Sequence, residues 1–168
     1  LGTILACQAG KDVYVEKPLS HSIYEGRQLI AAAEKYGRVV THGTQQRTRR
    51  NMLRDIKLMH AGFIGDIVHA RGVVYKNGGR TAIGKGAASA PPADLDYTLW
   101  QGPAPETPYL AKEDGGGLFV PYNWHWFWHW GNGEIGNQGV HEVDVAVWAI
   151  NKGMPKTISS IGGRYGWD

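Results

Sequence analysis

The stretch Val13-Tyr14-Val15-Glu16-Lys17-Pro18 decides the fold of this chain. Its apolar start is typical of a short buried strand, and Lys17 follows where that strand ends. Pro18 removes a backbone donor and holds Lys17 in an extended conformation, so the ammonium has a fixed direction. Open α/β sheets bind ligands at the carboxyl ends of their strands. Lys17 is therefore a candidate site residue, with an ordinary surface lysine at a turn as the alternative.

The flanking residues predict a parallel βαβ unit. Apolar periodicity and turn residues predict a helix over Leu1–Ala9 and a strand over Asp12–Glu16. A second helix is predicted from Ser20 or Ser22 to Gly37, and a second strand over Arg38–Thr44. A strand, a helix and a strand in this order favour a right-handed crossover in a parallel sheet. We also expect that the peptide bond before Pro18 is a candidate for the cis form.

The rest of the chain predicts a second region of mixed helix and strand. We expect a helix capped by Thr48 and ending near His60 (48–60), a strand (Asp66–Tyr75) and a surface excursion rich in Gly, Ala, Ser and Pro (Lys76–Pro92). An irregular proline-containing connection (Trp100–Pro108), a glycine turn (Gly115–Gly117), a helix (Ile135–Asn151) and a final strand (Thr157–Tyr165) are expected to follow. The change in composition near Gln45–Arg50 predicts a domain boundary there.

Bulk composition excludes few classes of protein. The chain has 168 residues and a net charge of +3, which indicates neither nucleic acid nor a membrane as a partner. The single cysteine, Cys7, excludes an internal disulfide. No stretch approaches the roughly 20 apolar residues that span a bilayer. Because Leu1 is not an initiator methionine, we expect an internal fragment. The compartment stays open, with the cytoplasm as the default and export if a preceding segment carries a signal.

A second polar cluster lies on one face of the predicted helix near the end of the chain. Asn137, His141, Asp144 and Trp148 are spaced by four, three and four residues. An imidazole can take a proton from an alcohol near neutral pH, and Asp144 is placed to orient that imidazole. Asn137 can bind a hydroxyl but cannot act as a base. The alternative for His141 is a buried histidine with ordinary structural partners.

Both polar clusters resemble one enzyme family. Glu16-Lys17-Pro18-Leu19 after a strand, and the later stretch from Gly131 through Asn137 and His141 to Asp144, resemble the Gfo/Idh/MocA family of NAD(P)-dependent oxidoreductases. The resemblance implies an α/β plus α+β architecture, in which a Rossmann domain precedes an open-sheet domain for substrate and oligomer contacts. Residues 1–46 would then be the C-terminal part of the Rossmann domain and 47–168 a partial α+β domain, both incomplete.

The resemblance also implies roles for individual residues. Lys17 matches a lysine that contacts nicotinamide and substrate, and His141 matches the catalytic histidine. Asn137 stands where many members carry aspartate, and this departure leaves open whether the site is active. No glycine-rich phosphate loop follows a strand; Gly131–Gly136 fits G-x-G-x-x-G by letter but follows an aromatic run. The residues expected to contact NAD or NADP are Glu16, Lys17, Pro18 and Gln45.

The aromatic run Asn123–Trp130 and the nearby basic residues are further candidates. If the run is extended, alternate tryptophans share one face. Trp124 would then stack on a sugar ring, and packing within a sheet or interface is the alternative. His125 and His129 have a spacing seen in metal sites, but no accompanying ligand pattern supports a metal. Arg47 lies at the predicted domain junction and is a candidate substrate contact, whereas no pattern supports nucleic-acid binding.

We therefore expect an oxidoreductase that transfers a hydride between a sugar or polyol and NAD or NADP. Lys17 and His141 would be catalytic, with Asn137, Asp144, Arg47 and Trp124 binding the substrate. The alternatives are an NAD-dependent glycosidase of related fold and a non-catalytic sugar-binding or scaffold relative. Exposed apolar positions on an open sheet are compatible with a homo-oligomer. Without a phosphate loop, these 168 residues alone are not expected to turn over substrate.

Overall fold

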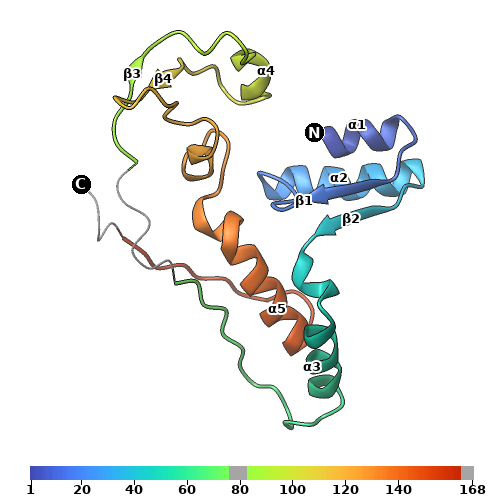
Figure 1. Ribbon diagram of the computed structural model, residues 1–168. Helices are drawn as coiled ribbons and strands as arrows, with labels where there is room; N and C mark the ends of the chain where they lie inside the picture. Colours follow the sequence, from blue (N-terminus) through green and yellow to red (C-terminus); the bar gives the residue numbers. More distant parts are fainter. Residues whose placement is uncertain (76–82, 164–168) are drawn as a thin grey trace.

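The predicted βαβ unit is present. The computed structural model describes residues 1–75 and 83–163. Strands β1 (Val13–Glu16) and β2 (Val40–Gly43) pair in parallel, with Val15 opposite His42. Helix α2 (Ile23–Tyr36) connects them, and α1 (Gly2–Gln8) packs along α2 (Figure 1). The peptide bond between Lys17 and Pro18 is cis. Lys17 thus lies directly after the carboxyl end of β1.

Local side-chain chemistry fixes both ends of α2. The Ser22 hydroxyl accepts a 3.2 Å hydrogen bond from the Glu25 amide, while Glu25 Oε2 accepts one of 2.8 Å from the His21 amide. These contacts satisfy amides that the first turn of a helix leaves without partners. The helix ends at Gly37, whose φ of 59° is readily adopted only by glycine. Sequence signals for this helix therefore agree with its boundaries.

Two helical segments, one directly after β2 and one near the end of the chain, pack against each other. A 3₁₀ turn, η1 (Gln45–Thr48), follows β2 and leads into α3 (Arg50–His60). A π-helical turn, η3 (Ile135–Gly139), continues into α5 (Val140–Ile150), and α5 lies beside α3 in Figure 1. The prediction that Thr48 caps α3 is wrong. The residue before the helix is Arg49, and the Thr48 hydroxyl donates to the Gln45 carbonyl within η1.

A separate cluster of aromatic residues forms the other packed region. It contains α4 (Tyr97–Gln101), whose end overlaps the start of the connection predicted at Trp100–Pro108 to be irregular. It also contains the short antiparallel strands β3 (Ala87–Ala88) and β4 (Leu110–Ala111). Its buried side chains are Tyr97, Tyr109, Leu118 and Phe119. The Phe119 ring packs against Phe127 and Trp130 at centroid distances of 4.7 and 4.9 Å. Aromatic packing therefore holds this region together where regular secondary structure is short.

The aromatic run is not extended, which was the condition for its alternate tryptophans to share one face. Residues Asn123–Trp126 form a 3₁₀ turn, η2, and no strand precedes Gly131. The tryptophans therefore do not alternate along one face. The chain must instead fold back tightly, because a Cβ at Gly131 would collide with the backbone of His125. Tertiary packing of the rings overrides the alternating pattern here.

Two predicted strands are also absent. Residues 66–75 and the described part of the other segment, 157–163, are irregular. A strand needs a second strand to take up its backbone hydrogen bonds. Neither segment has such a partner in the described residues, and Val68, Ile158 and Ile161 are exposed. Residues 76–82 of the predicted excursion lie outside the described residues. Among the helices described, none has the length and apolar character needed to cross a membrane.

Candidate functional site

Lys17 and Asn137 meet where the sheet and the later helix come together. Lys17 follows the last residue of β1, and its Nζ donates to the Asn137 backbone carbonyl at 2.8 Å and to Asn137 Oδ1 at 2.7 Å. The contact is partly buried, so these charge-assisted hydrogen bonds are stronger than they would be in open solvent. The structure therefore brings together two residues predicted for the site from separate parts of the sequence.

The conformation of η3 presents Asn137 to that ammonium. Asn137 is the central residue of the π-helical turn Ile135–Gly139. Such turns depart from α-helical hydrogen bonding and occur often at functional sites. Two glycines make the tight packing of this turn feasible: a Cβ at Gly136 would lie 3.0 Å from Asn132 Cβ, and one at Gly139 would lie 3.0 Å from Ile135 Cδ1. The glycines noted in the sequence thus serve the backbone of the turn.

His141 is the predicted base, and it is buried in the first turn of α5. Its side chain is 8% exposed, and its Nδ1 atom is buried without a hydrogen-bond partner among the described residues. A buried unpartnered polar atom is costly in a purely structural histidine. The expected orientation of His141 by Asp144 is not found, because the Asp144 carboxylate binds Arg47 instead. The site thus keeps a free imidazole nitrogen.

Arg47, Asp144 and Trp148 form a contact that we call the Arg47 clasp. Arg47 Nε and Nη2 each donate a 2.8 Å hydrogen bond to Asp144, a two-pronged arrangement suited to guanidinium. The guanidinium also stacks on Trp148, with Cζ 4.9 Å from the ring centroid. The hydrogen bond to Asp144 raises the pKa of Arg47, which stays charged. The clasp joins the segment after β2 to α5.

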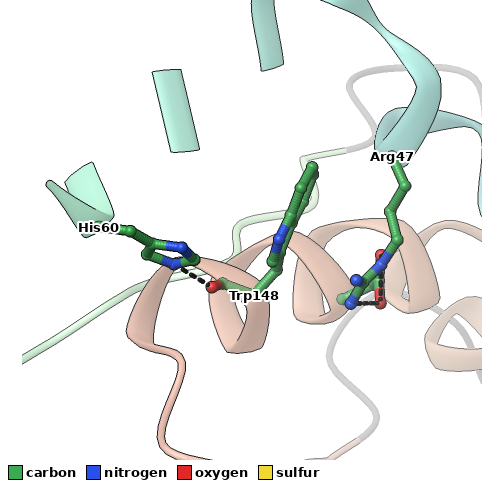
Figure 2. Close-up of polar contacts among 4 residues, drawn as sticks. Arg47, His60 and Trp148 are labelled. Carbon is green, nitrogen blue, oxygen red and sulfur yellow. Dashed lines mark hydrogen bonds and ion pairs between the residues drawn. The ribbon is translucent and has the colours of Figure 1, made fainter. Parts of the chain in front are cut away.

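His60 extends this arrangement at the end of α3. Its Nε2 donates a 2.9 Å hydrogen bond to the Trp148 carbonyl, so the proton is on Nε2 in this contact. Figure 2 shows the Trp148 indole standing between His60 and Arg47. Helix α5 is therefore held at two points along one side. His60 was not predicted as part of the site, since its contact is with a backbone carbonyl that no side-chain pattern reveals.

His42 is the second residue that the sequence prediction missed. It lies on β2 opposite Val15, and its Nε2 is buried without a described partner. Burial lowers the pKa of His42, and the nearby His141 lowers it further, whereas Asp144 and Glu16 act in the opposite direction. The sequence did offer a signal for His42, because it is a histidine within the predicted strand Arg38–Thr44. A polar residue inside a strand commonly makes a specific contact.

The ends of β1 and β2 carry the residues predicted to contact the cofactor. Gln45 Nε2 donates to the two Glu16 carboxylate oxygens at 3.0 and 3.2 Å. Glu16 and Gln45 are exposed, and Pro18 is half-buried beside them. The carboxyl edge of the parallel sheet therefore presents an amide, a carboxylate and the Lys17 ammonium together. Polar groups of this kind at strand ends suit a ligand bound above the sheet edge.

Trp124 lies in the aromatic region. It lines a small cavity of about 170 Å³ with Trp100 and Trp130, and its ring stacks on His125 at a centroid distance of 3.9 Å. Among the described residues, no hydrogen bond or ring contact joins Trp124 to the Lys17–Asn137 pair, so its role in substrate binding stays a prediction. No group of three or more His, Cys, Asp or Glu side chains among the described residues is arranged to hold a metal ion.

Comparison with known families identifies the sheet region. The family model for the Gfo/Idh/MocA oxidoreductase family, with an NAD-binding Rossmann fold, matches residues 3–44. This match covers α1, β1, α2 and β2, the elements that build the carboxyl edge beside Lys17. A comparison with curated proteins gave no match. Residues 3–44 are therefore similar to the NAD-binding Rossmann domain of the Gfo/Idh/MocA oxidoreductase family.

Proposed function

We propose that this protein is part of an oxidoreductase that oxidises an alcohol carbon of a sugar or polyol with NAD or NADP. The observation that carries the proposal is the contact between Lys17 Nζ and Asn137, one helical turn before the buried His141. These three residues provide a cation, an amide and a base in the partly buried region between the sheet edge and α5. A base can take the proton of an alcohol hydroxyl, a cation can stabilise the negative charge that develops on its oxygen, and an amide can orient the substrate, so these groups suit an alcohol oxidation.

The sheet edge fits the nicotinamide end of the cofactor. Glu16, Lys17, Pro18 and Gln45 would hold it there, because the Gln45 amide and the Lys17 ammonium supply donors at the strand ends. The dinucleotide, when bound, supplies an acceptor for hydride. Side chains of this chain would orient the substrate and accept its proton. The family match to residues 3–44 supports the placement of the cofactor at the sheet edge.

Lys17 and Asn137 orient the substrate and His141 removes its proton. The ammonium donates a hydrogen bond to the reacting hydroxyl oxygen, which stabilises negative charge as that oxygen loses its proton. The Asn137 amide fixes a neighbouring hydroxyl. The imidazole of His141 accepts the proton while the carbon–hydrogen bond breaks and a carbonyl forms. The unpartnered Nδ1 atom supports this role, since a free ring nitrogen can accept a proton.

The Arg47 clasp contributes by holding α5. Because Asp144 is one turn beyond His141 and binds Arg47 with two hydrogen bonds, the clasp sets the position of the helix that carries the base. Arg47 and Asp144 were also predicted to contact substrate, and this remains part of the proposal. The half-exposed guanidinium has donors left for a hydroxyl after it binds Asp144.

The test uses the full-length protein with a panel of sugars and polyols and follows reduced nicotinamide by its absorbance. Lys17→Ala and His141→Gln should each lower kcat/KM by about 10²- to 10⁴-fold. Lys11→Ala, at an exposed position before β1, is the matched control and should have no effect. Activity that survives both site variants would contradict the proposal. Release of free sugar without net reduced cofactor would indicate the glycosidase alternative.

A further inference from the structure

A second hollow in the molecule lies close to the proposed site. Its volume is about 500 Å³, and it is formed by the start of α2, the proline-containing loop after α4 and the end of the aromatic run. The lining residues used below are His21, Glu25, Gln101, Trp128 and Trp130. Hollows of this volume that combine aromatic surface with a few polar groups are typical of small-molecule sites.

Trp128 gives this hollow an open aromatic surface. Its side chain is 79% exposed although the neighbouring Trp130 is packed against Phe119 and Trp100. The exposed indole lines the hollow, so its face is available to a ligand there. The flat face of an indole suits the carbon–hydrogen face of a sugar ring, which is apolar, while the ring hydroxyls point outward to polar neighbours.

The polar lining has hydrogen-bonding capacity that the described chain does not use. Glu25 Oε2 accepts from the His21 amide, whereas Oε1 has no donor in the described residues. Gln101 is 6% exposed, and its Oε1 accepts a 2.7 Å hydrogen bond from the Thr107 amide, which fixes the side chain. Its Nε2 has no acceptor in the same part of the chain. A carboxylate disfavours an anionic ligand and a purely apolar one, but it suits neutral hydroxyl groups.

One residue that lines the hollow, His21, is linked to the chain segments that carry Lys17 and Asn137. His21 follows Lys17 after three residues, and the His21 carbonyl accepts a 3.1 Å hydrogen bond from Asn132 Nδ2. Asn132 in turn lies three residues before η3, the turn that carries Asn137. The segments that hold the proposed reacting centre therefore also build the edge of the hollow.

We propose that the hollow lined by His21, Glu25, Gln101 and Trp128 binds a second sugar ring. The preferred substrate is then a disaccharide or other glycoside, with one ring at Lys17 and His141 and the other stacked on Trp128. The assignment of the first ring rests on the proposed function. The stacking and the free carboxylate and amide groups stand on the geometry of the hollow alone.

The first experiment measures binding to the full-length protein without cofactor, by tryptophan fluorescence and saturation-transfer NMR. The probes are maltose, cellobiose, lactose and sucrose, with glucose, galactose and fructose as single rings. At least one disaccharide should bind tighter than its own monosaccharides. Trp128→Ala should weaken that binding about tenfold, while Trp128→Phe should retain most of it. Phe63→Ala removes a ring that is 77% exposed outside the hollow and is the matched control.

The second experiment separates this proposal from the proposed function. In steady-state assays of reduced nicotinamide, Trp128→Ala should raise KM for the disaccharide about tenfold and leave the kinetics with single sugars unchanged. Disaccharide binding that depends on Trp128 without any oxidation would overturn the function and support the subsite. Oxidation of single sugars, with disaccharide binding absent or indifferent to Trp128, would overturn the subsite and support the function.

Discussion

The ammonium of Lys17 is bound by both oxygens of Asn137, at 2.7 Å to the side chain and 2.8 Å to the backbone, across 120 positions of sequence. This contact links the end of the parallel sheet to a π-helical turn. Lys17 is half-buried, whereas the neighbouring Glu16 is exposed. The contact directs the Lys17 ammonium toward the helix that carries His141. The consequences of this arrangement can be measured.

Removal of the Asn137 side chain should harm activity less than removal of Lys17. In Asn137→Ala the backbone carbonyl still accepts from Lys17, so the ammonium loses one of two acceptors. We expect kcat/KM with the preferred sugar or polyol to fall by about tenfold, in line with a single hydrogen bond to a charged group. Asn137→Asp keeps an acceptor in the same place and serves as the comparison. An alanine variant as inactive as Lys17→Ala would contradict this ranking.

Loss of Arg47 should loosen helix α5. Arg47→Ala removes both hydrogen bonds to Asp144 and the stacking on Trp148, and because the guanidinium is partly exposed we expect a loss of only about 1 kcal/mol in the free energy of unfolding. Arg47→Lys should recover little of it, since an ammonium cannot make the two-pronged contact. Urea denaturation with the double variant Arg47→Ala/Asp144→Ala measures the coupling.

The Arg54–Asp55 pair is the matched control for the clasp. Its nitrogen and oxygen are 2.7 Å apart, but both side chains are exposed and adjacent in sequence. Arg54→Ala should therefore leave the free energy of unfolding nearly unchanged. Equal losses for Arg47→Ala and Arg54→Ala would mean that the clasp adds nothing beyond an ordinary surface ion pair.

Acidification should destabilise the protein through His42. Its pKa is lowered from the ordinary value of 6.5, chiefly by burial, so near and below pH 6.5 the unfolded chain binds a proton that the folded chain resists. The contribution of His42 to stability is therefore complete above pH 6.5 and is lost as the pH falls toward the lowered value. In chemical denaturation at pH 5 to 8, His42→Gln should show a shallower decline than the original protein. Parallel profiles for the two proteins would contradict the assignment.

A methyl group at Gly131 should disrupt the aromatic region. The Cβ of Gly131→Ala would collide with the His125 backbone, which cannot rotate away as a side chain could. We expect a loss of about 2 kcal/mol in the free energy of unfolding, a typical cost of forced overpacking. Gly162→Ala is the control, because no atom lies within 4 Å of its Cβ position. Near-ultraviolet circular dichroism, which follows packed tryptophans, should change with the first substitution only.

The βαβ unit could be read from the sequence because its signals are local. The apolar run before Lys17, the cap at Ser22 and the stop at Gly37 each act within a few residues, and all three agree with the structure. Helical periodicity likewise places His141 and Asp144 one turn apart on α5, whereas Asn137 lies in the π-helical turn before that helix. The predictions of strands at 66–75 and 157–165 were wrong where the structure describes these residues. A strand forms only with a partner strand, and local sequence signals do not show whether a partner is present.

By itself, the sequence indicated candidate site residues and the local elements on which they lie. Only the tertiary structure decided their partners: Lys17 with Asn137 across 120 positions, and Arg47 with Asp144 across 97, which took the carboxylate away from His141. The physical reason is that hydrogen bonds and ring stacking depend on positions in space. Residue periodicity fixes such positions within one element but leaves the approach of two distant elements to the packing of the whole chain.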